Sequence, residues 1–298
     1  MKTLNILITG GTGFVGRHLT QLLTKEGHHA YVLTRFPEKY HNTTNTTYLH
    51  YPETPKALPI IHAVVNLAGE SLFGYWTPRK KEAIRNSRIL TTQTVIDLVQ
   101  QMDKKPSVFI SGSAVGYYGM SDDQIFTEQT TTPGNDFLAQ VVTDWEKTAS
   151  QASELGIRTV FTRFGVILGE KGALPYMSLP VRLFIGGKTG SGEQWISWVH
   201  IDDVVQLILF CIQNEHIDGP VNVTAPKPKR NKAFIRLLAR VLHRPYWLPT
   251  PTTLIHTSLG QVSELITKGQ YVLPKKAETF QYPFRYPDVE SALKQILK

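Results

Sequence analysis

The stretch that decides the fold is Ile6-Leu7-Ile8-Thr9-Gly10-Gly11-Thr12-Gly13-Phe14-Val15-Gly16, close to the amino end of the chain. A β-rich run over residues 4–9 leads directly into the glycines, and helical periodicity begins at Phe14. Three of the glycines recur at every third residue, a spacing that lets a backbone turn sharply and approach a pyrophosphate closely. The amide groups at the start of the following helix then face the anion. We therefore predict a dinucleotide-binding turn, with contacts at Gly10, Thr12, Gly13, Phe14, Val15 and Gly16.

The end of the second predicted strand, residues 30–34, bears on the choice of cofactor. An NAD enzyme usually places Asp or Glu here to bind the ribose 2′-hydroxyl, whereas this chain has Thr34-Arg35. The planar guanidinium of Arg35 can bind a 2′-phosphate, so the sequence predicts NADP(H) in preference to NAD(H). The alternative is that Arg35 is an ordinary solvated loop residue.

Downstream, strand-like and helix-like segments alternate, which predicts a parallel sheet with right-handed crossovers. The predicted strands are residues 63–67, 108–112 and 159–164, and the predicted helices are residues 78–101, opened by Thr77-Pro78, and 136–153.

Beyond Gly165 the alternation gives way to segments rich in glycine and proline. A helix over residues 200–214 and a strand over 221–223 are predicted to return to the sheet. We expect an α/β protein, with a Rossmann-type, doubly wound parallel sheet and a smaller, interleaved C-terminal substrate or cap domain. The predicted boundaries are 1–165 for the dinucleotide-binding domain, with 200–225 returning to it, and 166–298 for the smaller domain.

Composition excludes several classes of protein. The one cysteine, Cys211, rules out an intramolecular disulfide and a multi-cysteine metal site, and no His/Asp/Glu cluster has metal-ligand spacing. There is no apolar run of about 18 residues and no signal peptide, which predicts a cytoplasmic protein without membrane contact. The formal net charge of +8 comes without a nucleic-acid-binding motif, so we expect no nucleic-acid partner.

Several motifs resemble the extended short-chain dehydrogenase/reductase superfamily, which includes the nucleotide-sugar epimerases. They are TGGTGFVG, Asn66-Leu67-Ala68-Gly69, SGSAVGYYG at 111–119, Arg163-Phe164-Gly165 and Val199-His200-Ile201-Asp202-Asp203. More narrowly, NLAGE, WTPRKKEAIRNSRI, FLAQVVTDWE and the block LGQVSELITKGQYVLP that starts at Leu259 resemble uncharacterised epimerase family proteins, some labelled as cell-division inhibitors. The resemblance implies further cofactor contacts at Leu67, Ala68, Gly69 and Arg163, and it allows a homodimer.

The superfamily's chemistry rests on a Tyr-x-x-x-Lys pair one helical turn apart, in which the lysine lowers the tyrosine pKa. Alignment on Glu146 places Leu138 and Val142 at these positions, and a shift by one residue places Phe137 and Val141 there. Both choices are apolar, so the usual base and its lysine are absent.

Other polar residues are candidates for the chemistry. Ser113 stands where the family's Ser or Thr stabilises the substrate hydroxyl, and Tyr118 follows the same strand, so both are predicted as catalytic. Glu70, Arg88 and His200 are predicted as substrate contacts. The alternative is that Ser113 and Tyr118 line the nicotinamide pocket without moving protons.

Two functions follow from these motifs. The first is an NADP(H)-dependent oxidoreductase or epimerase that acts on a small polar substrate, such as a nucleotide sugar. The second is a cofactor-binding redox sensor or regulatory protein without turnover, suggested by the missing Tyr/Lys pair.

Overall fold

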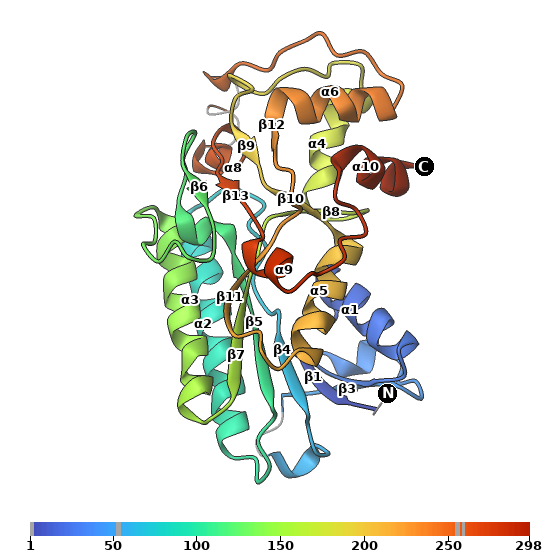
Figure 1. Ribbon diagram of the computed structural model, residues 1–298, viewed down its shortest axis with the longest axis vertical. Coiled ribbons are helices and arrows are strands. Elements are labelled where there is room, and N and C mark those ends of the chain that lie inside the picture. The colour runs from blue at the N-terminus through green and yellow to red at the C-terminus, as the bar shows by residue number, and fades with distance from the viewer. Residues whose placement is uncertain (1–2, 52–54, 254–256, 258–259) are drawn as a thin grey trace.

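The computed structural model describes residues 3–51, 55–253, 257 and 260–298, and the first residue of the C-terminal block, Leu259, lies outside them. Within these ranges, a seven-stranded sheet has the order β11-β7-β5-β4-β1-β2-β3, with every neighbouring pair parallel (Figure 1). Its strands are β1 (Asn5–Thr9), β2 (His29–Leu33), β3 (Thr46–Leu49), β4 (Ala63–Asn66), β5 (Val108–Ala114), β7 (Arg158–Phe164) and β11 (Gly219–Val223). The predicted Rossmann-type α/β fold is therefore confirmed.

Two pairs of helices cover the sheet, one pair on each face (Figure 1). They are α1 (Phe14–Lys25) with α5 (Ile201–Gln213), and α2 (Pro78–Gln100) with α3 (Phe137–Glu154). Strand β1 shows why both faces are covered, since Ile6 and Ile8 join the core beneath α1 and α5 while Leu7 joins the core beneath α2 and α3. A strand whose successive residues are all apolar needs a packed layer on each side.

The register of the central strands fixes where a ligand can bind. Thr9, the last residue of β1, is paired with Leu33 of β2 and Asn66 of β4. The three strands therefore end level, and the segments that follow them meet at one edge of the sheet. The strand order reverses between β1 and β4, which is where open α/β sheets bind their ligands.

A second lobe lies beyond the carboxyl ends of the strands (Figure 1). Its core is formed by Trp198, Phe234, Leu238 and Leu293, among others. The elements of this lobe are β8 (Val166–Leu168), α4 (Ala173–Arg182), β9 (Trp195–Ile196), β10 (Trp198–His200), β12 (Lys229–Arg230), α6 (Asn231–Val241) and α10 (Val289–Leu297).

Further short elements lie between the strands and helices named above. They are η1 (Pro37–Lys39), η2 (Pro55–Ala57), η3 (Val115–Tyr118), β6 (Ile125–Phe126), η4 (Gly260–Ser263), α8 (Glu264–Thr267), β13 (Tyr271–Val272) and α9 (Lys275–Thr279). Strand β13 pairs with β6, and α9 packs on β11, so the tail returns to the main sheet. The domain boundaries stay a prediction. Among the described helices, none is long and apolar enough to cross a membrane.

The position of Cys211 in α5 makes its thiol a probe of this core. The side chain is fully buried, and burial raises the pKa of the thiol to about 12. We expect the native protein to resist Ellman's reagent at pH 8, because only about one thiol in ten thousand is ionised and none is accessible. Denaturant should release one reactive thiol per chain. Rapid labelling of the native protein would contradict this packing.

Candidate cofactor and active site

The glycine turn between β1 and α1 is packed tightly against the next segment of the sheet edge. Gly10 has a φ of +66°, and a Cβ added there would lie 2.7 Å from the Leu67 carbonyl carbon and 2.9 Å from the Ala68 nitrogen. A Cβ on Gly16 would lie 2.2 Å from the Gly10 oxygen. A side chain at either position would displace backbone, so these glycines are required by the close approach.

The amino end of α1 is open to a ligand. Its N-cap residue is Gly13, and no side chain caps the helix. The Phe14 ring lies against the connection between β8 and α4, because Cβ atoms on Gly169 and Gly172 would lie 2.6 Å and 3.2 Å from it. The backbone amides of the first turn, and not the Phe14 side chain, are therefore the groups that can bind an anion.

Arg35 follows β2 on the other side of the turn. Its side chain is exposed, and the guanidinium carbon lies 6.0 Å from the centre of the Phe36 ring. None of the ion pairs found within the described ranges involves Arg35. The guanidinium can therefore bind an anion at the carboxyl end of β2.

The β4–α2 loop (residues 67–77) borders the turn on its other side. Its first residues are fixed by Thr9, whose carbonyl accepts the Leu67 amide at 3.2 Å and whose hydroxyl accepts the Ala68 amide at 3.2 Å. The Thr9 hydroxyl also donates to Asn66 Oδ1 at 2.6 Å. The predicted cofactor contacts Leu67 and Ala68 thus lie directly against the glycine turn.

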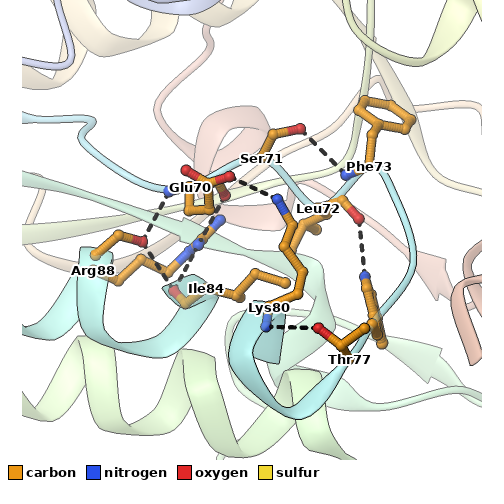
Figure 2. A network of polar contacts seen from close by, with 10 residues as sticks. Glu70, Ser71, Leu72, Phe73, Thr77, Lys80, Ile84 and Arg88 are labelled. Carbon is orange, nitrogen blue, oxygen red and sulfur yellow. Dashed lines mark hydrogen bonds and ion pairs between the residues drawn. The ribbon is translucent and has the colours of Figure 1, made fainter. Parts of the chain in front are cut away.

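Two predicted substrate contacts hold this loop on α2 (Figure 2). Arg88 Nη1 donates to the carbonyls of Glu70 at 3.1 Å and Ile84 at 2.9 Å, directly beneath Gly69. Burial lowers the pKa of Arg88 to about 10, although Glu70 opposes this shift. The Glu70 carboxylate pairs with Lys80 at 2.6 Å. Both charged side chains are therefore already engaged in fixing the loop.

Ser113 belongs to a buried ion-pair network at the end of β5. Its hydroxyl donates to Glu146 Oε1 at 2.6 Å, and Arg163 binds both oxygens of the same carboxylate at 2.8 Å. The Arg163 guanidinium carbon also lies 3.5 Å from the centre of the Tyr117 ring. Sequence reasoning used Glu146 only as a landmark. The signal that it missed was an arginine inside a buried strand, which needs a buried carboxylate.

Tyr118 and His200 are enclosed by protein partners. The Tyr118 hydroxyl donates to Asn222 Oδ1 at 2.8 Å, its ring stacks on Phe126, and burial raises its pKa. His200 accepts the Asp202 amide at Nδ1, its Nε2 bonds to the Gln295 side chain, and burial lowers its pKa. No motif in the sequence indicates Asn222. Both side chains are buried, and the Tyr118 hydroxyl and the two His200 ring nitrogens bond to protein groups.

The geometry distinguishes the two alignments of the missing Tyr/Lys pair. The Leu138 Cβ and a methyl carbon of Val142 lie 3.6 Å and 4.0 Å from a Cβ built on Gly116, in the segment after β5. Phe137 instead packs on Trp76, with 5.6 Å between ring centres. Leu138 and Val142 therefore face the end of β5, and both are apolar.

Comparisons with known proteins agree with this geometry. Residues 6–224 match the NAD dependent epimerase/dehydratase family, and residues 250–296 match a domain of unknown function, DUF1731. The epimerase family protein YfhF of Bacillus subtilis (strain 168) is 47% identical over 297 residues, which cover 99% of this chain and 98% of that protein.

Two solved structures are also similar. The human epimerase family protein SDR39U1 (isoform 2), solved with NADPH, has a TM-score of 0.87 at 30% identity, covering 98% of this chain and 99% of that chain. A nucleoside-diphosphate sugar epimerase from Corynebacterium glutamicum has a TM-score of 0.80 at 34% identity, covering 99% of this chain and 58% of that chain.

The buried pair of Arg163 and Glu146 predicts a large effect on stability. We expect Arg163→Met to lower the free energy of unfolding by about 3–5 kcal/mol, because it leaves a buried carboxylate without a charged partner. Arg85→Met is the matched control, since its pair with Asp144 is exposed and is expected to contribute at most about 1 kcal/mol. Urea denaturation measures both values. Equal effects of the two substitutions would show that the Arg163 pair is not isolated from water.

Proposed function

Because the chain belongs to the NAD-dependent epimerase/dehydratase family, we propose that it binds NADP(H) and acts as an oxidoreductase or epimerase on a small organic molecule. The observation that carries the cofactor preference is the position of Arg35 just beyond β2, where NAD enzymes use a carboxylate; its side chain is exposed and forms none of the ion pairs found among the described residues. NADPH in the similar human protein supports the same preference. A nucleotide sugar remains one candidate substrate.

In this proposal, different groups of the chain bind different parts of the cofactor. The first-turn amides of α1, from Gly13 to Gly16, bind the pyrophosphate, and Arg35 binds the 2′-phosphate. Leu67 and Ala68 border the nicotinamide half, because they follow β4 on the far side of the turn from Arg35. Arg163 acts as a positioning residue, since its guanidinium is held by Glu146 and fixes the Tyr117 ring.

The proton chemistry must differ from that of the superfamily. NADP(H) supplies a hydride when bound, but Leu138 and Val142 cannot donate or accept the accompanying proton. The Ser113 hydroxyl donates a hydrogen bond to the Glu146 carboxylate and is buried. We propose that Ser113 and Tyr118 shape the nicotinamide pocket, and that the proton is exchanged with solvent.

Because the apolar residues Leu138 and Val142 occupy the positions of the Tyr/Lys pair, a second function is also favoured, that of a cofactor-binding regulator without turnover. Deuterated NADPH, labelled in turn on each face of C4, separates the two functions when it is incubated with a panel of carbonyl compounds that includes keto forms of nucleotide sugars. Transfer of deuterium to any member is the expected result for an enzyme. Stoichiometric NADPH binding with no transfer across the panel would favour the regulator.

Arg35 gives the direct test of cofactor choice. We expect NADPH to bind at least about tenfold more tightly than NADH, and Arg35→Ala to remove that preference by weakening NADPH alone, because one charge-assisted contact to the 2′-phosphate is lost. Calorimetric titration measures both affinities. Lys39→Ala is the matched control, since Lys39 is a nearby exposed cation over the Phe36 ring. A parallel loss of NADPH and NADH affinity in Arg35→Ala would contradict the assignment.

A further inference from the structure

One side of α4 exposes a row of large apolar side chains. Tyr176, Leu179 and Leu183 recur at helical spacing, so they share one side, here called the α4 face. Their exposed fractions are 62%, 53% and 60%. The opposite side of the helix, with Leu174 and Val181, is buried in the core of the second lobe. A contiguous row of this kind marks a surface that a ligand covers.

The α4 face adjoins the loop that borders the cofactor turn. The Phe73 ring, which Figure 2 shows at the outer part of the β4–α2 loop, stacks on Tyr176 with 4.5 Å between ring centres. The loop starts where Ala68 meets Gly10, and α4 starts where Gly172 meets Phe14. Both segments therefore leave the cofactor turn and meet again at the Phe73–Tyr176 stack, which places the apolar row on the substrate side of the turn.

Basic residues outnumber acidic ones around this face. Residues 171–192 and 219–263 contain ten Lys and Arg residues and no Asp or Glu, whereas the rest of the chain has 22 basic against 24 acidic residues. Arg182 and Lys188 are exposed and form none of the ion pairs found in the described part of the chain. Two carboxylates flank residues 171–192: Glu170 lies with Arg182 around one cavity, and Glu193 is bound by Lys232. The field at the face therefore favours an anion.

We propose that the α4 face and Phe73 form the substrate-recognition surface, and that the substrate is an amphiphilic anion. Its apolar chain or ring packs on Phe73, Tyr176 and the two leucines, and its carboxylate or phosphate group lies by Arg182 or Lys188. This inference rests on the proposed function, because it assigns the substrate class of the same site. An apolar row offers no partners for the hydroxyl groups of a sugar, and burying those groups unpaired is costly.

The test compares ligands that share a tail or a charge. Decyl phosphate, decyl maltoside and UDP-glucose are titrated calorimetrically, each as monomers, into the protein saturated with NADPH. We expect one molecule of decyl phosphate to bind saturably to each chain. The neutral decyl maltoside should bind more weakly, and UDP-glucose should not bind. Leu183→Asp should weaken decyl phosphate about tenfold or more, because it places a charge in the apolar row. Leu90→Asp is the matched control, at an exposed leucine on α2.

Arg182→Gln combined with Lys188→Gln should weaken decyl phosphate but leave decyl maltoside unchanged. The proposal is overturned if UDP-glucose binds and decyl phosphate does not, or if Leu183→Asp has no more effect than Leu90→Asp. Binding only to vesicles of anionic lipid would also overturn it, and would make the face a membrane-docking surface. If NADPH fails to bind but decyl phosphate still binds, the proposed function is overturned, whereas the assignment of the α4 face as a binding surface for amphiphilic anions stands.

Discussion

The close contact between the glycine turn and the segment after β4 is the constraint on which the site depends. Gly10 approaches the Leu67 and Ala68 backbone so closely that a single added carbon would overlap it. Thr9 links the two segments, because its carbonyl and hydroxyl oxygens both accept hydrogen bonds from backbone amides of the β4–α2 loop. Because this contact fixes the end of β1 beside the end of β4, the open helix terminus, Arg35 and the loop come together at one edge of the sheet.

A consequence of this arrangement is that most charged residues near the site serve the scaffold. Arg88 and Lys80 hold the β4–α2 loop, and Arg163 is fixed on Glu146 beside Ser113. Among the described residues, Arg35 takes part in no ion pair, and Leu179 and Leu183 of the α4 face are more than half exposed. We propose that this rigid edge binds the dinucleotide, that Arg35 binds its 2′-phosphate, and that the α4 face beside it binds the substrate.

The local features of the fold could be predicted from the sequence. The glycine spacing, the continuous apolar run of β1 and the Thr77-Pro78 start of α2 depend on neighbouring residues, so their patterns are visible in a short window. The absence of the Tyr/Lys pair was also visible in the sequence. Leu138 and Val142 lie close to Gly116, just after β5, which supports the alignment that places these two residues at the positions of the pair.

The partners of the polar side chains could not be predicted in the same way. Ser113 meets Glu146 from another element, and Tyr118 meets Asn222 from a strand 104 positions further along the chain. Such groups come together only when the sheet and its helices have packed. No pattern within a short stretch of sequence therefore identifies the pairs. His200 illustrates the same limit, because its Nε2 partner, Gln295, lies in the last helix of the chain.

Amide hydrogen exchange, followed with and without NADPH, tests the central claim most directly. If the turn binds the dinucleotide, the amides of residues 12–17 should become protected on binding, together with those of residues 67–70, because the two segments form one edge. Protection confined to other segments, in a protein that binds NADPH, would show that the dinucleotide lies elsewhere and would contradict this account of the site.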